Sequence, residues 1–155
     1  MERSHYISMI DYYFQVTPIV ALLGPRQCGK TTLALEYAKK HLRVTHFDLE
    51  DPIHLSRLDN PMLALQDLEG LIIIDEVQLK PHLFPILRVM IDRFHEKQRY
   101  LILGSASRDL IQHSSETLAG RISYFELTPF TLSETHEMKK LWLRGGFPRS
   151  YLSNT

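Results

Sequence analysis

Unbroken apolar runs and helically spaced apolar residues alternate along this chain of 155 residues. Apolar runs are typical of strands covered on both faces, whereas apolar positions three and four residues apart are typical of amphipathic helices. Strands are predicted over residues 19–23, 44–49, 71–74, 100–103 and 122–127. Helices are predicted over residues 30–41, 61–68, 81–95, 108–118 and 131–143, the fourth of them broken.

Strands that alternate with helices predict an α/β fold, in which a parallel sheet is covered by helices on both faces. A chain of this length buries roughly 70% of its unfolded surface, which is enough for one core. Residues 1–16 are expected to form a helical segment on the outside, and residues 17–155 the core domain. Residues 145–150, GGFPRS, predict a turn-rich end.

Composition narrows the class of protein. The 18 basic and 18 acidic residues give a net charge of zero, which argues against a surface devoted to nucleic acid but leaves room for a local basic patch. One cysteine excludes an internal disulfide framework and fits a reducing compartment. No apolar run approaches the ~20 residues of a membrane span, and residues 1–16 carry charges that a signal peptide's apolar segment lacks. We therefore expect a cytoplasmic protein with no membrane partner.

A glycine-rich loop follows the first predicted strand. Residues 24–32 read GPRQCGKTT and fit the pattern G-x-x-x-x-G-K-[ST] without a mismatch, straight before a predicted helix. A chance glycine turn is the alternative, which the strand–loop–helix context disfavours. The predicted nucleotide-binding residues are Gly24, Pro25, Arg26, Gln27, Cys28, Gly29, Lys30, Thr31 and Thr32.

Each position of this loop has a physical role in phosphate binding. Gly24 and Gly29 allow a tight turn with the N–H groups pointing inward. Lys30 reaches the β- and γ-phosphates, and Thr31 offers its hydroxyl to Mg²⁺. Cys28 occupies a variable position of such loops, where only the backbone N–H contributes to phosphate binding. A thiol at a helix N-terminus can have a lowered pKa, so oxidation of Cys28 is a possible block on ATP binding.

The strand over residues 71–74 ends in two carboxylates, Asp75 and Glu76. Asp75 can hold Mg²⁺ through water, and Glu76 is placed to act as general base on an attacking water. A helix cap or a solvated turn is the alternative for this pair. Glu76 favours a water-activating ATPase over a P-loop kinase, whose strand end needs only the aspartate.

Polar residues after two further elements complete the candidate site. Ser105 follows the strand over 100–103, where it can orient the attacking water, with Ser107 as the less favoured candidate. Ser107 is also suited to cap the following helix. Arg121 precedes the last strand and can supply positive charge to a γ-phosphate, usually on a neighbouring subunit. A surface arginine paired with a carboxylate is the alternative.

Two other groups of residues have open interpretations. Asp48, Glu50 and Asp51 follow the second strand and either support the site or form a turn, which the Asp51-Pro52 pair favours. The aromatic run over residues 12–14 either packs a helix or stacks on a base, and packing is the commoner role. The histidines form no metal-binding spacing.

Together these segments resemble the AAA-type ATPase domain of the family AAA_14, which is often followed by a C-terminal domain of the DUF4143 type. The resemblance runs from about Ile19 to the C-terminus. The segments that carry it are Gly24–Thr32, Phe47–Pro52, Leu71–Gln78, Leu103–Ser107, Leu118–Arg121 with Glu126–Phe130, and Gly145–Pro148.

The resemblance implies a three-layer P-loop NTPase fold of the AAA/ASCE type, with five parallel strands in the order 5-1-4-3-2. It implies ATP and Mg²⁺ as cofactors, slow hydrolysis to ADP, Asp75 and Glu76 as the acidic motif, and Ser105 as the sensor. Proteins of this family usually continue past the point where this chain stops, at Thr155. We therefore expect the helical lid and the C-terminal domain to be absent.

Three functions are consistent with these residues. The first is an ATPase that couples hydrolysis to a protein partner or a downstream domain, as a homo-oligomer if Arg121 acts across subunits. The second is a nucleotide-gated binding module with little turnover, linked to DNA or to a toxin–antitoxin-like system. The third, a small-molecule kinase, is the weakest because Glu76 and Ser105 suit water activation.

Overall fold

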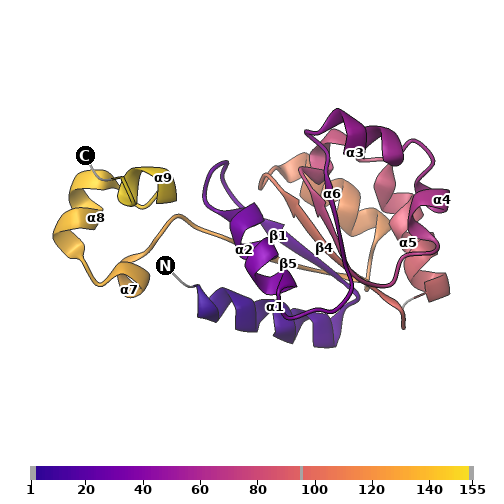
Figure 1. Cartoon of the computed structure of the whole chain (residues 1–155), viewed down its shortest axis with the longest axis horizontal. Coiled ribbons are helices and arrows are strands. Elements are labelled where there is room, and N and C mark those ends of the chain that lie inside the picture. The colour runs from indigo at the N-terminus through magenta and orange to yellow at the C-terminus, as the bar shows by residue number, and fades with distance from the viewer. Residues whose placement is uncertain (1–2, 95, 154–155) are drawn as a thin grey trace.

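Five short strands form one parallel sheet in the computed structural model, which describes residues 3–94 and 96–153 (Figure 1). The strands are β1 (Ile19–Leu23), β2 (Val44–Asp48), β3 (Gly70–Asp75), β4 (Gln98–Gly104) and β5 (Ile122–Glu126). Their order is β2-β3-β4-β1-β5, and every neighbouring pair is parallel. This arrangement confirms the α/β class and the predicted strand order.

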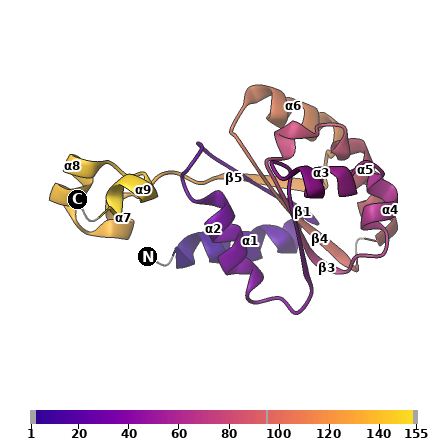
Figure 2. The same cartoon turned by 45° about the horizontal axis from the view of Figure 1, so that its top comes forward.

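Helices cover both faces of the sheet (Figures 1 and 2). The helices α1 (Ser4–Val16) and α2 (Lys30–Ala38) lie on one face. The other face carries α3 (Pro52–Arg57), α4 (Pro61–Leu65), α5 (Leu83–Phe94) and α6 (Arg108–Thr117). All residues of β1 are buried, with Val20 and Leu22 toward α1 and α2 and the others toward the opposite core. An unbroken apolar run therefore means burial on two faces here.

Several helix boundaries differ from the sequence-based prediction. The helix over 30–41 ends at Ala38, and α6 is continuous rather than broken. Pro52 ends the second strand segment but also opens α3, a helix that the sequence analysis missed. The Asp51 side chain accepts a hydrogen bond from Ile53 N at 2.8 Å and caps that helix, so the favoured interpretation of Asp51 as a turn residue is confirmed.

The C-terminal helices lie beyond β5, apart from the sheet, in both views (Figures 1 and 2). The predicted helix over 131–143 is two helices, α7 (Leu132–Thr135) and α8 (Met138–Arg144), because His136 adopts a left-handed φ of 53° between them. The turn-rich end expected over residues 145–150 contains most of another short helix, α9 (Pro148–Tyr151). The expected core domain over residues 17–155 stays a prediction.

The aromatic run near the N-terminus packs α1 against the sheet layer. Tyr13 stacks on Phe125 with ring centroids 5.5 Å apart, and Phe14 stacks on Tyr37 at 6.0 Å. Tyr12 is the exposed member. Packing is thus the role of two of these rings, as favoured from the sequence. Among the described helices, none combines the length and the apolar character that crossing a membrane requires.

Candidate nucleotide-binding site

The glycine-rich loop joins β1 to α2 and needs glycine at both ends. At Gly24 a Cβ would lie 2.3 Å from the carbonyl oxygen of Leu127, so the loop passes too close to the end of β5 for any side chain. Gly29 has a φ of +98° and forms the N-cap of α2. Gln27 also has a positive φ, of 63°. The loop leads directly into the N-terminus of α2, and a helix N-terminus favours anions.

The lysine of the loop lies inside it. Lys30 is only 5% exposed, and its Nζ donates hydrogen bonds to the carbonyl oxygens of Gly24 at 3.0 Å and Pro25 at 2.9 Å. Both partners are neutral, so the ammonium charge is not cancelled by them. A positive charge and a helix N-terminus therefore meet in the same loop.

The end of β3 lies directly beside the start of α2. Thr31 Oγ1 donates a 2.5 Å hydrogen bond to Asp75 Oδ2, and Asp75 is 3% exposed. Burial raises the pKa of Asp75, while the hydrogen bonds from the Thr31 hydroxyl and the Glu76 amide oppose that rise. Both donors are neutral groups, so they do not cancel the charge of the carboxylate. Its oxygens suit Mg²⁺, which commonly takes one or two protein oxygens together with water and substrate phosphates.

Glu76 stands at a sharp change of backbone direction. Its φ of 54° and ψ of 43° are left-handed, which is uncommon for a residue other than glycine and is often found at functional sites. Its N–H donates to Asp75 Oδ1 at 2.9 Å. Its carboxylate accepts a hydrogen bond from Nε2 of Gln78, which lies in the 3₁₀ turn η1 (Val77–Leu79).

The two serines after β4 occupy different environments. Ser107 is the N-cap of α6, and its hydroxyl accepts a hydrogen bond from Leu110 N at 3.2 Å, which confirms the capping interpretation. Ser105 follows Gly104 at the carboxyl end of β4, and its N–H donates to Gln78 Oε1 at 3.4 Å. The structure therefore brings Ser105 to the acidic strand end and assigns Ser107 to the helix.

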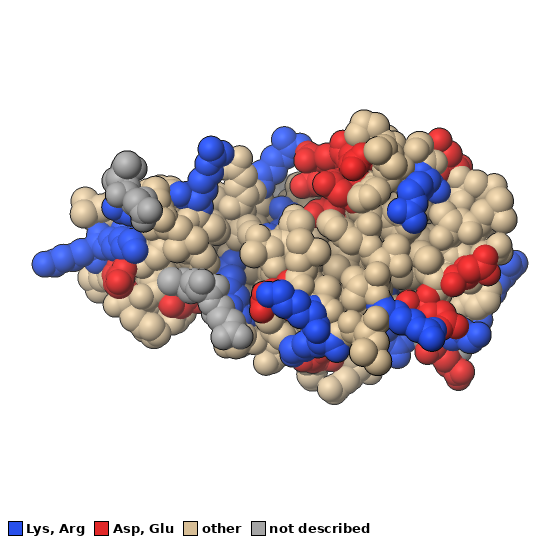
Figure 3. Space-filling view, viewed as in Figure 1, with Lys and Arg blue, Asp and Glu red and all other residues tan. Residues whose placement is uncertain are grey.

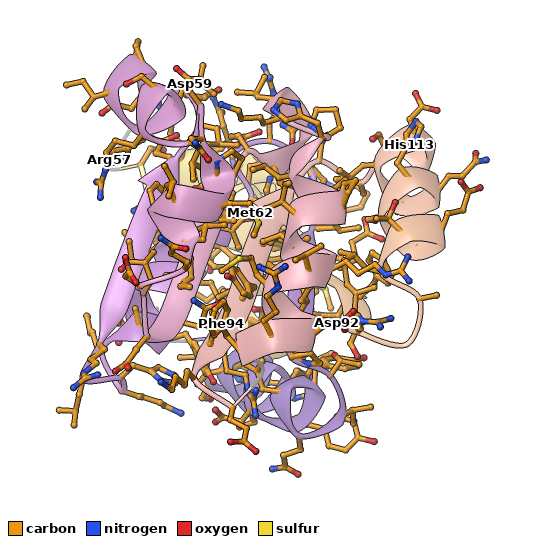
Figure 4. All side chains as sticks on the ribbon, turned by 90° about the vertical axis from the view of Figure 1, so that its right-hand side faces the viewer. Arg57, Asp59, Met62, Asp92, Phe94 and His113 are labelled. Atoms are coloured by element: carbon orange, nitrogen blue, oxygen red, sulfur yellow. The ribbon has the colours of Figure 1, made fainter. Side chains whose placement is uncertain are left out.

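Arg121 lies at the other end of the sheet from the phosphate loop. Since β1 and β5 are parallel, with Leu23 opposite Glu126, the residue before β5 is at the amino edge. Its guanidinium pairs with Asp92 of α5, with Nε 2.7 Å from Oδ1. Figure 4, which views the face covered by α3 to α6, shows Asp92 beside the loop that joins α6 to β5. This matches the alternative of a surface arginine paired with a carboxylate, and a role at a γ-phosphate requires a second subunit.

A pocket of about 450 Å³ opens beside the loop, on the side of the C-terminal helices. Its lining comes from three parts of the chain: Arg3, then Cys28, Gly29, Thr32, Leu33 and Glu36, then Phe130, Pro148 and Leu152. The side chain of Cys28 is fully buried, and burial raises the pKa of its thiol. The expectation of a lowered thiol pKa at this helix N-terminus is therefore wrong, because loss of solvation exceeds the effects of Lys30 and Arg3.

Charged side chains are unevenly distributed on the face shown in Figure 3. A group of acidic side chains lies on the upper edge near α3, and basic side chains project from the C-terminal helices. Asp48 is the last residue of β2, and its Oδ1 accepts a hydrogen bond from Glu50 N at 3.0 Å in the turn before α3. Local hydrogen bonds thus account for Asp48 and Asp51.

Two residues at this site are not predicted from the sequence. Arg3 donates to the carbonyl oxygens of Cys28 at 3.2 Å and Thr128 at 2.8 Å, and it pairs with Glu134 of α7 at 2.6 Å. Gln78 belongs to a segment that carries the family resemblance, but its residue type alone indicates no role. The capping box of Thr131 and Glu134 signals the start of α7, but nothing local signals the pairing of Glu134 with Arg3.

The sheet order and the glycine-rich loop at the end of β1 define a P-loop NTPase domain. Comparison with protein families identifies the family of this domain. The model of AAA_14, an AAA domain, matches residues 16–136, so the chain belongs to this family. The uncharacterized proteins Mb2031c of Mycobacterium bovis and Rv2008c of Mycobacterium tuberculosis are each 49% identical over 140 residues. The match covers 89% of this chain and 32% of each relative, so the chain spans about a third of their length.

Solved structures support the same fold. The Walker-type ATPase paby2304 of Pyrococcus abyssi has a TM-score of 0.65 and 14% identity, with 95% of this chain and 64% of that chain covered. A RuvB variant of Thermotoga maritima has a TM-score of 0.58 and 21% identity, with 92% and 51% covered. Family and fold together make nucleotide binding the expected property of the site.

Proposed function

We propose that this domain binds ATP with Mg²⁺ and hydrolyses it slowly. One observation carries the proposal. The Thr31 hydroxyl meets the buried carboxylate of Asp75 at 2.5 Å, so the phosphate loop and the acidic strand end form one site. The Walker-type ATPase among the structural neighbours and the membership in an AAA family support hydrolysis as the reaction.

The phosphates would lie in the loop. The N-terminus of α2 and the Lys30 ammonium belong to the same loop, and both attract anions. Lys30 would exchange its bonds to the carbonyls of Gly24 and Pro25 for the β- and γ-phosphate oxygens. Thr31 and Asp75 would hold Mg²⁺, which neutralises charge on the phosphates when bound.

Glu76 and Ser105 would activate and orient the attacking water. Glu76 accepts a proton as the water oxygen bonds to the γ-phosphorus and the bond to the β–γ bridging oxygen breaks, which yields ADP and inorganic phosphate. Ser105, at the neighbouring strand end, would orient that water. Arg121 would act only from a neighbouring subunit in a homo-oligomer, after exchanging its pairing with Asp92.

The adenosine would enter the pocket beside Gly29. Its volume of about 450 Å³ lies within the usual range of small-molecule sites, and Phe130, Pro148 and Leu152 give it apolar walls. Because these residues come from the C-terminal segment, base binding and the position of the C-terminal helices are linked. Such a link is the means by which hydrolysis would act on a protein partner or on further domains; the relatives from mycobacteria are about three times as long as this chain.

Calorimetric titration with ATP, with and without Mg²⁺, tests the binding site. We expect wild type to bind ATP and Lys30→Met to lose at least about tenfold in affinity, since a charged contact to phosphate is removed. Lys39→Met is the matched control, because Lys39 is an exposed lysine at the far end of the same helix, paired with Glu36. Equal affinity of wild type and Lys30→Met would contradict the site.

A further inference from the structure

Gln78 connects two of the proposed catalytic-site residues. Its Nε2 donates to Oε2 of Glu76, and its Oε1 accepts from the N–H of Ser105 at 3.4 Å. Both ends of one side-chain amide are therefore engaged, one at the end of β3 and one at the end of β4. These are the two strand ends between which the attacking water is proposed to lie.

The neighbouring strand leaves room for this amide. A Cβ at Gly104 would lie 2.9 Å from Gln78 Oε1 and 2.9 Å from Leu110 Cδ2. A larger residue would therefore have to displace the ends of these two side chains, although the backbone of Gly104 itself is not left-handed. The Gln78 amide thus lies close to the backbone of β4, where its two hydrogen bonds hold it.

The amide also fixes the direction of the Glu76 carboxylate. Glu76 follows Asp75 in a left-handed conformation, so its side chain leaves the strand at an unusual angle. Gln78 holds Oε2, whereas Oε1 has no hydrogen-bond partner within the described residues 3–94 and 96–153. One carboxylate oxygen is held in place and the other can accept a proton from water.

We propose that Gln78 is a positioning residue that orients Glu76 for water activation and sets its place relative to Ser105. The inference rests on the proposed ATP hydrolysis. It predicts that Gln78 affects turnover and leaves ATP binding unchanged, because Lys30 and Thr31, not Glu76, are assigned to the phosphates and the cation. A role in packing alone predicts no specific effect on turnover.

Three enzymes separate these roles by steady-state phosphate release and ATP titration. Gln78→Met keeps the length of the side chain and removes both hydrogen bonds to Glu76 and Ser105. Gln112→Met is the matched control, because Gln112 Nε2 donates to Glu116 Oε1 at 3.1 Å on the exposed surface of α6. We expect kcat of Gln78→Met to fall about tenfold or more, with KM and the Kd for ATP within about twofold of wild type. Gln112→Met should match wild type.

A second comparison shows whether Gln78 acts through Glu76. In a Glu76→Ala background, Gln78→Met should lower the residual rate no further, since the carboxylate it orients is gone. Equal losses in both backgrounds would indicate a general structural effect and overturn the proposal. Should the methionine variant fail to fold, as judged by circular dichroism, Gln78→Asn replaces it, because an amide one methylene shorter cannot reach both partners.

The outcomes distinguish this inference from the function on which it rests. Phosphate release by wild type, with Gln78→Met within twofold of it, overturns the role of Gln78 and leaves the ATPase in place. Failure of wild type to bind ATP contradicts the proposed function itself. Binding by wild type without any phosphate release overturns hydrolysis and the role of Gln78 together, and favours the nucleotide-gated binding module.

Discussion

Arg3 joins the first helical segment, the phosphate loop and the C-terminal helices, and its removal should cost much of the domain's stability. Its guanidinium forms two bonds to the Glu134 carboxylate, at 2.6 and 3.1 Å. It also donates to the carbonyl oxygens of Cys28 and Thr128. Arg3→Met removes every one of these bonds and keeps most of the apolar stem, so it isolates the polar interactions.

The magnitude follows from burial. The side chain of Arg3 is 7% exposed and that of Glu134 is 18% exposed, so this is a largely desolvated pair. Removing one partner of a buried ion pair lowers the free energy of unfolding by about 3–5 kcal/mol. Because water reaches part of the Glu134 side chain, we expect a loss near the lower end of this range. We therefore expect the free energy of unfolding to fall by about 3 kcal/mol at pH 7, which shifts the urea midpoint down by about 1–2 M.

The pH dependence has a definite sign. Burial raises the pKa of Glu134, but hydrogen bonds from Arg3 and Thr131 outweigh it and leave the pKa lowered. A lowered folded pKa gives stability that is present above the unfolded value of about 4.3 and is lost as the pH falls through the folded value. In Arg3→Met the main cause of the lowering is gone. The difference between wild type and variant should therefore be constant from pH 7 to about 5 and shrink below about 4.5.

Urea unfolding followed by circular dichroism at pH 7 and pH 4 measures both effects. Lys40→Met is the control, because the Lys40–Asp11 pair is exposed and should be worth less than about 1 kcal/mol. A loss for Arg3→Met that is no larger than that of the control would refute the assignment of Arg3 as a buried anchor. A difference that grows on acidification would refute the electrostatic reasoning.

Three further predictions concern single positions. Gly24→Ala should abolish ATP binding and lower stability, since its Cβ would lie 2.3 Å from Leu127 O, as titration and thermal unfolding would show. Arg121→Ala should lower the free energy of unfolding by less than about 1 kcal/mol, because the pair with Asp92 is partly exposed. If the variant loses ATP hydrolysis and regains it on mixing with Lys30→Ala subunits, Arg121 acts on a neighbouring subunit. Unchanged hydrolysis would remove Arg121 from the mechanism. Cys28 should react with iodoacetamide at pH 8 at least about tenfold more slowly in the folded than in the unfolded protein; equal rates would contradict its burial.

The strands and the phosphate loop can be predicted because local sequence determines them. Residues of β1 are all apolar since both faces of the sheet are covered, and the loop motif reflects the backbone turn that Gly24 and Gly29 permit. The strand order follows from family resemblance, since periodicity alone does not say which strands pair. Local pattern together with that resemblance is therefore sufficient to predict the fold and the loop.

Features that depend on contacts between distant residues cannot be predicted in this way. Arg3 and Glu134 are 131 residues apart in sequence, so the local sequence around neither residue predicts that they form an ion pair. The break between α7 and α8 depends on His136 adopting a left-handed conformation that helical periodicity does not reveal. The predicted direction of the Cys28 pKa shift is wrong, because the sequence shows the helix N-terminus beside the thiol but not its burial.

Phosphate release from ATP by wild type and by Glu76→Gln tests the central claim most directly, with ATP binding measured on both proteins. The substitution keeps the shape of the side chain and removes the base, so binding should persist while the rate falls about a hundredfold or more. Wild type should release phosphate only when Mg²⁺ is present. Equal rates for the two proteins, or a wild type that binds ATP and releases no phosphate, would contradict the account.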